Sequence, residues 1–227
     1  MRSKIKAILF DFDGTILDTE TPAYEAWQSI FADHGTTLPL SMWSQSIGTN
    51  KSDFDPFEYL QERTCKSLDR DTVQRVRRAR NRALIAKQGS LPGVSAWLDE
   101  ARALGIPCAI ASSSPREWIV PLLERLSLTG FFSVIATADD VSRTKPDPAV
   151  FLLAASKLGV IPSEAVAVED SAHGVRASVA AGAFTVAVPN QMTAAQDFSA
   201  ANVVLASLAN ATIADVAQSA ARQDIGH

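Results

Sequence analysis

The sequence predicts an α/β fold, with a Rossmann-like parallel sheet as its core and an all-helical unit inserted into that core. Two observations predict the sheet: short apolar runs recur along the chain, and helical patterns separate them. A third observation predicts the insertion, because residues 20–90 interrupt this rhythm and contain no clear strand.

Six short runs rich in β-branched or other apolar residues are expected to form the strands. The helical stretches between them favour parallel pairing, with helices covering both faces of the sheet. The last run is the weakest of the six. The expected strands are residues 5–11, 106–114, 132–138, 165–170, 184–190 and 202–207.

Four helical patterns fill the intervals that follow the inserted segment. They cover residues 93–105, 116–128, 146–159 and 171–182. Three of them end at a glycine, the residue that most often adopts the left-handed conformation of a helix C-cap. These glycines are Gly105, Gly159 and Gly182.

The inserted segment is expected to form three helices. The apolar pattern around Trp27 suggests the first, and residues 55–68 and 70–88 suggest the others. The chain returns to the sheet at residues 89–93, where Gly and Pro mark a turn. The expected domains are a core of residues 1–17 and 90–227 and a helical cap of residues 18–89.

The composition bears on partners and on location. The chain has 227 residues, 47% hydrophobic and 20% charged, which is ordinary for a globular protein. A formal net charge of −4 gives no reason to expect nucleic acid or an anionic membrane surface as partner. No apolar run approaches the roughly 20 residues of a membrane span. Cys65 and Cys108 lie far apart and fit two reduced thiols in a cytoplasmic protein, which we expect to be a monomer or homodimer.

Polar residues follow four of the expected strands. In open α/β sheets, ligands bind beyond the carboxyl ends of the strands, so side chains at these ends share one rim. Acids directly after a buried strand are unusual, because carboxylates are rarely fully buried unless they are paired or bind a metal. The residues at the four ends are Asp11 and Asp13; Ser112, Ser113 and Ser114; Thr144 and Lys145; and Glu169 and Asp170.

Four segments of the chain, taken in order, resemble the four motifs of the haloacid dehalogenase superfamily: DFDGTILDTE, ASSSP, KPDP and VEDSAHG. The resemblance covers nearly the whole chain. It is strongest to the phosphatase and β-phosphoglucomutase-like branch, in which a helical cap follows the first strand. It implies phosphoryl transfer through an aspartyl-phosphate intermediate.

The acids at the rim call for a cation. The carboxylates of Asp11 and Asp13 repel each other at this spacing, and Glu169 and Asp170 add further negative charge. A hard divalent ion with oxygen ligands, Mg²⁺, suits such a set. The resemblance implies carboxylate ligation by Asp11 and Asp170 and a backbone carbonyl from Asp13. Glu169 is either a ligand or lies one shell further out.

The resemblance also implies catalytic roles. Asp11 is expected to attack phosphorus as the nucleophile. Asp13 is expected to protonate the leaving alkoxide and then to activate water. Lys145 and Ser112 are expected to hold the transferring phosphoryl oxygens through electrostatic and hydrogen-bonding contacts.

Three further residues are candidates for phosphate binding. Gly14 permits a tight turn and a close approach of the backbone to phosphate. Ser113 is expected either to bind phosphate or to cap the next helix. Lys51 matches a basic cap residue that holds the second phosphate in β-phosphoglucomutases.

We therefore expect a Mg²⁺-dependent phosphatase that acts on a small phosphorylated metabolite, such as a sugar phosphate. A sugar-phosphate mutase is the alternative, but Ala23 stands where the resemblance places a mutase histidine. Haloacid dehalogenases lack a second aspartate, whereas Asp13 is present here. Two alternatives from other functional classes stay open: a phospho-accepting receiver domain and a non-catalytic binding module. The order of the motifs argues against a receiver domain.

Overall fold

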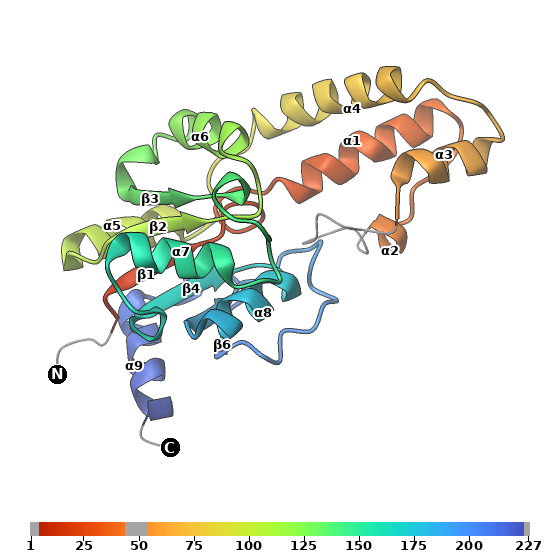
Figure 1. Cartoon of the computed structure of the whole chain (residues 1–227). Helices are drawn as coiled ribbons and strands as arrows, with labels where there is room; N and C mark the ends of the chain where they lie inside the picture. The colour runs from red at the N-terminus through yellow and green to blue at the C-terminus, as the bar shows by residue number, and fades with distance from the viewer. Residues whose placement is uncertain (1–4, 44–53, 225–227) are drawn as a thin grey trace.

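A six-stranded sheet forms the centre of the computed structural model, which describes residues 5–43 and 54–224. The strand order is β3-β2-β1-β4-β5-β6, and every neighbouring pair runs parallel. The predicted α/β fold is thus confirmed (Figure 1). The strands are β1 (Ala7–Phe10), β2 (Cys108–Ala111), β3 (Phe132–Ala136), β4 (Ala165–Glu169), β5 (Phe184–Ala187) and β6 (Val203–Val204).

Each strand is shorter than the run that predicted it. β1 ends at Phe10, which pairs with Ile110 of β2 and Val168 of β4. Asp11 adds one more ladder bond, because its backbone N–H donates to Val168 O at 2.9 Å. The acids that end the run therefore lie at and beyond the last ladder pair, at the rim of the sheet.

The sheet buries both of its faces, which explains why β1 is a continuous apolar run. Side chains alternate between the faces along a strand. Ile8 and Phe10 accordingly join one hydrophobic cluster, and Ala7 and Leu9 join the other. The Phe10 face is covered by α5 (Val94–Leu104), α6 (Arg116–Arg125) and α9 (Ile213–Asp224), and the Leu9 face by α7 (Ala149–Leu158) and α8 (Ala172–Ala181).

The helix ends follow the expected chemistry. Gly105, Gly159 and Gly182 are the C-caps of α5, α7 and α8, with φ angles of 68°, 73° and 87°. At the start of α8, the hydroxyl of Ser171 accepts a hydrogen bond from the N–H of Gly174. Such caps satisfy backbone groups that a helix leaves unpaired at its ends.

Between β1 and α5 the chain forms helices that extend away from the sheet (Figure 1). Their apolar side chains make a separate hydrophobic cluster, which includes Trp27, Phe31 and Leu60. One turn of helix at residues 40–43 was not expected, because it is too short for a periodic pattern to reveal. The helices are α1 (Glu20–Asp33), α2 (Leu40–Trp43), α3 (Pro56–Thr64) and α4 (Arg70–Ile85).

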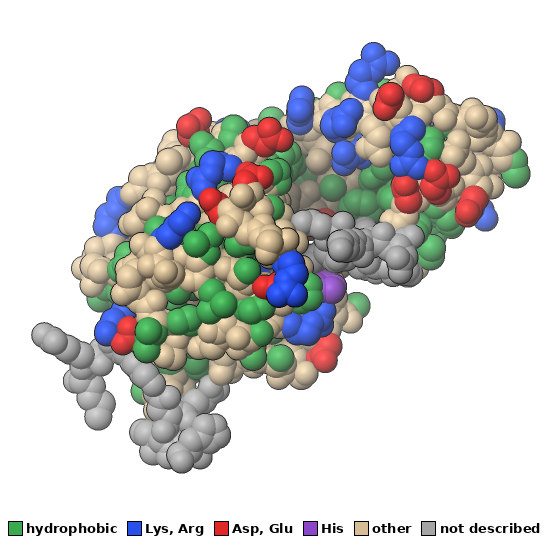
Figure 2. All heavy atoms as spheres, in the orientation of Figure 1, with side chains coloured by type: hydrophobic (Ala, Val, Ile, Leu, Met, Phe, Trp, Pro, Cys, Tyr) green, Lys and Arg blue, Asp and Glu red, His purple; other side chains and the backbone are tan. Residues whose placement is uncertain are grey.

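Charged side chains of both signs are interspersed over this helical unit (Figure 2). Arg70 of α4 pairs with Asp55 at 2.7 Å, and Arg80 pairs with Asp33 of α1 at 2.6 Å. These exposed pairs tie neighbouring helices together but contribute little stability each.

The two segments that connect the helical unit to the sheet run side by side. Leu17 forms an isolated antiparallel bridge with Ser90, and the N–H of Leu91 donates to Ile16 O at 2.8 Å. The expected division at residues 17/18 and 89/90 falls at this pairing, and the division into domains stays a prediction. No helix among the described residues is long and apolar enough to cross a membrane.

Candidate active site

The carboxyl ends of β1, β2 and β4 bring most of the predicted site residues to one rim. Acids follow β1 and stand at the end of β4, serines follow β2, and a lysine from the loop before α7 reaches the same place. Their burial is unusual for polar groups, so partners must compensate the lost hydration. The buried members are Asp11, Ser112, Lys145, Glu169 and Asp170.

Lys145 is the cation at the centre of this rim. Its ammonium donates to Asp11 Oδ1 and, at 2.6 Å, to Glu169 Oε1. Burial by itself lowers the pKa of Lys145, but the two carboxylates outweigh it and hold that pKa above its ordinary value. Lys145 is therefore a fixed positive charge between two acids.

Glu169 is held from its other side by the start of α8. Its Oε2 accepts hydrogen bonds from the backbone N–H of Asp170 at 3.1 Å and of Ser171 at 3.2 Å, and from Ser171 Oγ at 3.1 Å. A Cβ built on Gly174 would overlap the Glu169 carboxyl, so the backbone of α8 comes as close as glycine allows.

Three buried carboxylates surround a space suited to a cation. One oxygen each from Asp11, Glu169 and Asp170 lies within 4.8 Å of the others. Within the described part of the chain, the ammonium that pairs with this set is that of Lys145, which contacts Asp11 and Glu169, so the three acids outnumber the cations beside them. A Cβ on Gly14 would overlap the carboxyl group of Asp170, so glycine at position 14 leaves room for this acid in the cluster. Buried carboxylate oxygens with excess charge fit a hard divalent metal ion.

The pKa values of these acids reflect the same excess. Burial, opposed by Lys145 and assisted by Glu169, raises the pKa of Asp11 to about 8 in the protein without metal. Burial and the charges of Glu169 and Asp11 raise the pKa of Asp170 well above its usual range. A divalent cation would reverse both shifts, because it favours the ionised carboxylates.

Asp13 lies outside this cluster and is held by a different set of partners. Its Oδ1 accepts from Thr19 Oγ1 and from Trp118 Nε1, both at 2.8 Å. Its Oδ2 accepts from Ser114 Oγ at 2.6 Å. The side chain of Asp13 thus has different hydrogen-bond partners from that of Asp11, and two carboxylates in different environments can take different chemical roles.

The remaining predicted residues take the following positions. Ser112 is buried, and its Oγ accepts from the N–H of Ser114 at 3.0 Å. Ser113 Oγ accepts from the N–H of Lys145 at 3.3 Å, which ties the lysine loop to the end of β2. Gly14 has a φ of +77°, a conformation that favours glycine. Lys51 lies outside the described residues.

Sequence reasoning missed two residues of the site. Asn190 follows β5, and its Nδ2 donates to Asp170 Oδ2 at 2.7 Å. A polar residue after a strand is the same signal that identified the site residues after four of the expected strands, and it could have identified Asn190. Trp118 is in the first turn of α6, where an aromatic residue gives no such signal.

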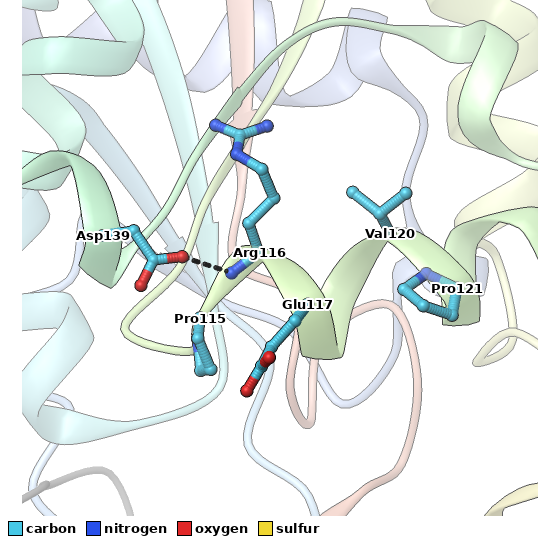
Figure 3. Close-up of a pocket in the computed structure, with 6 residues that line it drawn as sticks. All are labelled: Pro115, Arg116, Glu117, Val120, Pro121 and Asp139. Carbon is cyan, nitrogen blue, oxygen red and sulfur yellow. Dashed lines mark hydrogen bonds between the residues drawn. The ribbon is translucent and has the colours of Figure 1, made fainter.

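Two hollows flank the first turn of α6. One, of about 770 Å³, is lined by Pro115, Arg116, Glu117, Val120, Pro121 and Asp139. Figure 3 shows its side chains, with the Arg116 N–H donating to Asp139 at 2.8 Å, and none of them is a predicted site residue. The other, of about 510 Å³, is lined by Arg82 of α4 and by Ser114, Pro115, Glu117 and Trp118. The second hollow therefore adjoins Asp13, through Ser114 and Trp118.

Known proteins are similar to this chain in sequence and in fold. The model of the haloacid dehalogenase-like hydrolases matches residues 8–188. The chain is 47% identical over 189 residues to a Bacillus subtilis (strain 168) protein with the name "Putative phosphatase YhcW", covering 83% of this chain and 86% of that protein. It is 29% identical over 178 residues to the phosphorylated carbohydrates phosphatase of Thermotoga maritima, covering 78% of this chain and 82% of that one.

A solved structure agrees with these matches. The crystal structure of a CbbY mutant from Rhodobacter sphaeroides, in complex with xylulose-(1,5)bisphosphate, resembles this structure with a TM-score of 0.69. The two sequences are 28% identical, and the match covers 93% of this chain and 99% of the other.

Proposed function

Because the chain belongs to the haloacid dehalogenase-like hydrolase family and is a phosphatase, we propose that it hydrolyses a small phosphorylated sugar or a similar metabolite. The Thermotoga relative is named for phosphorylated carbohydrates, and the CbbY structure holds a sugar bisphosphate, which supports this substrate class. The observation that carries the proposal is the convergence of Asp11, Lys145 and the acid cluster on one buried rim.

In the proposed reaction, a carboxylate oxygen of Asp11 attacks phosphorus and the bond to the leaving alcohol oxygen breaks. Asp13 gives a proton to that oxygen, so the alcohol leaves neutral. Asp13 then takes a proton from water, which attacks the aspartyl-phosphate and releases inorganic phosphate. The separate environments of Asp11 and Asp13 support this division of roles.

Mg²⁺ is the proposed cofactor. Asp11, Asp170 and the backbone carbonyl of Asp13 would hold it, with Glu169 either a ligand or one shell further out. When bound, the ion would offset the charge of the transferring phosphoryl group. The excess of buried carboxylates over cations among the residues described at this rim supports a divalent ion there.

Four residues are proposed to bind the phosphoryl group. Lys145 would supply a fixed positive charge, and Ser112 a hydroxyl donor. Gly14 would allow its backbone to approach the phosphate oxygens, and Ser113 would fix the lysine loop or bind phosphate itself. Lys51 stays a prediction for a second phosphate.

Hydrolysis is favoured over transfer to a second sugar hydroxyl. Ala23 takes the place of the mutase histidine and packs against the apolar cluster of the helical unit, where it offers no proton-transfer group. We also propose that residues 18–89 act as a cap over a core of residues 1–17 and 90–227. A receiver or a binding module is no longer an alternative, because the chain is a phosphatase.

The test is phosphate release from a panel of sugar phosphates, nucleotides and small organic phosphates, with Mg²⁺ and with EDTA. Asp11→Asn is expected to lose nearly all turnover while it stays folded, because it removes the nucleophile. Asp99→Asn, at an exposed acid of α5, is the matched control and should keep full activity. Turnover by Asp11→Asn, or full activity in EDTA, would contradict the mechanism. Activity confined to nucleotides would contradict the substrate class.

A further inference from the structure

The orientation of Asp13 depends on residues far away in the sequence. Trp118 donates its indole N–H to Asp13 Oδ1 across 105 residues of chain, and Ser114 donates to Oδ2 across 101. Thr19, six residues from Asp13, supplies the remaining donor. Two of the three contacts that fix this carboxyl group therefore come from the loop after β2, which holds Ser114, and from the first turn of α6, which holds Trp118.

Trp118 is well suited to hold a side chain in one orientation. The indole has two rotatable bonds and a single N–H donor, so its position determines the direction of its hydrogen bond. It is half-buried and packs against the hydrophobic cluster on the Phe10 face of the sheet. The indole is thereby anchored to the sheet core, and Asp13 is oriented relative to the sheet as well as to its own loop.

The same side chain faces space that a substrate can enter. Trp118 and Ser114 line the hollow of about 510 Å³, and Arg82 of α4 lines it from the helical unit. This volume is within the range of sites for small molecules. A general acid must lie within hydrogen-bond reach of the oxygen that it protonates. The leaving alcohol would therefore sit beside Asp13, on the side where Trp118 and Ser114 meet the hollow.

We propose that Trp118 is a positioning residue, whose indole N–H holds Asp13 aimed at the leaving oxygen of a substrate in this hollow. The inference rests on the role of Asp13 under the proposed function. Proton donation to the leaving group then depends on α6. Loss of the indole N–H should therefore lower the rate of hydrolysis selectively for substrates with poor leaving groups.

The experiment compares two leaving groups in Trp118→Phe, which keeps an aromatic ring and removes the N–H donor. The substrates are p-nitrophenyl phosphate, whose phenolate leaves without a proton, and the alkyl phosphate that the wild type hydrolyses fastest in the panel above. The value of kcat/KM reports the steps up to departure of the leaving group. General acid catalysis is worth roughly 10²–10⁴ in rate, so a misdirected acid should lose about tenfold on the alkyl phosphate. The loss on p-nitrophenyl phosphate should stay below about twofold, because that step uses no proton from Asp13.

Two further variants make the result specific. Trp97→Phe also removes an indole N–H, which here donates to Leu208 O and Ala211 O in the core. It should lower thermal stability but leave the ratio of the two kcat/KM values unchanged. Ser114→Ala removes the other distant donor to Asp13 and should show the same selectivity as Trp118→Phe. It therefore tests the inference even if Trp118→Phe folds poorly.

An equal loss on both substrates, or no loss on the alkyl phosphate, would overturn the inference. Asp13→Asn separates this failure from failure of the proposed function. If Asp13→Asn is selective against the alkyl phosphate and the Trp118 and Ser114 variants are not, the positioning role is wrong and the role of Asp13 holds. If Asp13→Asn keeps alkyl phosphatase activity, the proposed role of Asp13 is itself wrong.

Discussion

The carboxyl group of Glu169 fills the space that a side chain at position 174 would need. A Cβ built on Gly174 overlaps this carboxyl, although Gly174 stands in the first turn of α8 and has no positive φ. Glycine is unfavourable inside a helix, but here it leaves room for the buried carboxyl group of Glu169. Glu169 in turn accepts a hydrogen bond from the ammonium of Lys145 at 2.6 Å.

Gly174→Ala is expected to destabilise the protein and to reduce activity. Alanine in a helix is normally favoured over glycine by about 1 kcal/mol, so propensity alone predicts stabilisation. Overpacking typically costs about 1–3 kcal/mol and here displaces Glu169 from Lys145. Urea unfolding and the turnover assay measure both effects. Gly89→Ala is the control, because nothing lies within 4 Å of the added Cβ; a stabilised, fully active Gly174→Ala would contradict this account.

Lys145→Met is expected to abolish turnover and to destabilise the metal-free protein. It leaves Asp11 and Glu169 buried without their ammonium partner, and removal of one member of a buried ion pair typically costs about 3–5 kcal/mol. Added Mg²⁺ should recover part of the lost stability, because it supplies positive charge to the same acids. Thermal melts with EDTA and with Mg²⁺ measure this.

Lys157→Met is the matched control for that variant, since Lys157 is exposed and its ammonium lies 3.7 Å from Asp140. It should change neither turnover nor melting by much. If Lys145→Met melts like Lys157→Met in EDTA, the ammonium does not compensate the buried acids in the way that the geometry indicates.

The sequence was most informative where the controlling pattern is local. The change from Phe10 to Asp11 marks the end of β1 because a buried face cannot accept unpaired acids. The glycine C-caps could also be predicted from the sequence, because each depends on the backbone conformation of one residue. The four polar strand ends predicted a shared rim because parallel strands place their carboxyl ends on one edge.

Features that depend on tertiary contacts could not be predicted from the sequence. The contact between Trp118 and Asp13 depends on how α6 leaves β2, and no spacing in the sequence records that geometry. The need for glycine at position 174 comes from Glu169, whose carboxyl group lies against α8 in the folded chain. The one-turn helix α2 lies below the length at which periodicity can be recognised.

Glu20 provides a pH test of the boundary between the sheet and the helical unit. It begins α1, and its side chain has no cationic partner among the described residues. Burial, followed by the charges of Asp13 and Asp18, raises the pKa of Glu20 from 4.5 to about 7. Asp170, directly after β4, is a further acid that interacts with Glu20.

The direction in which pH changes the stability of the folded protein follows from proton binding by Glu20. Between pH 4.5 and about 7 the folded protein holds the Glu20 proton more tightly than the unfolded chain does, so wild-type stability falls as pH rises through this range. Glu20→Gln carries no charge to bury and avoids this loss. In EDTA, its melting temperature relative to wild type should therefore be higher at pH 8 than at pH 5. Glu25→Gln, at an exposed acid of the same helix, should show no such change between the two pH values. If Glu20→Gln gains nothing at pH 8, the carboxyl group of Glu20 is not buried among acids in solution.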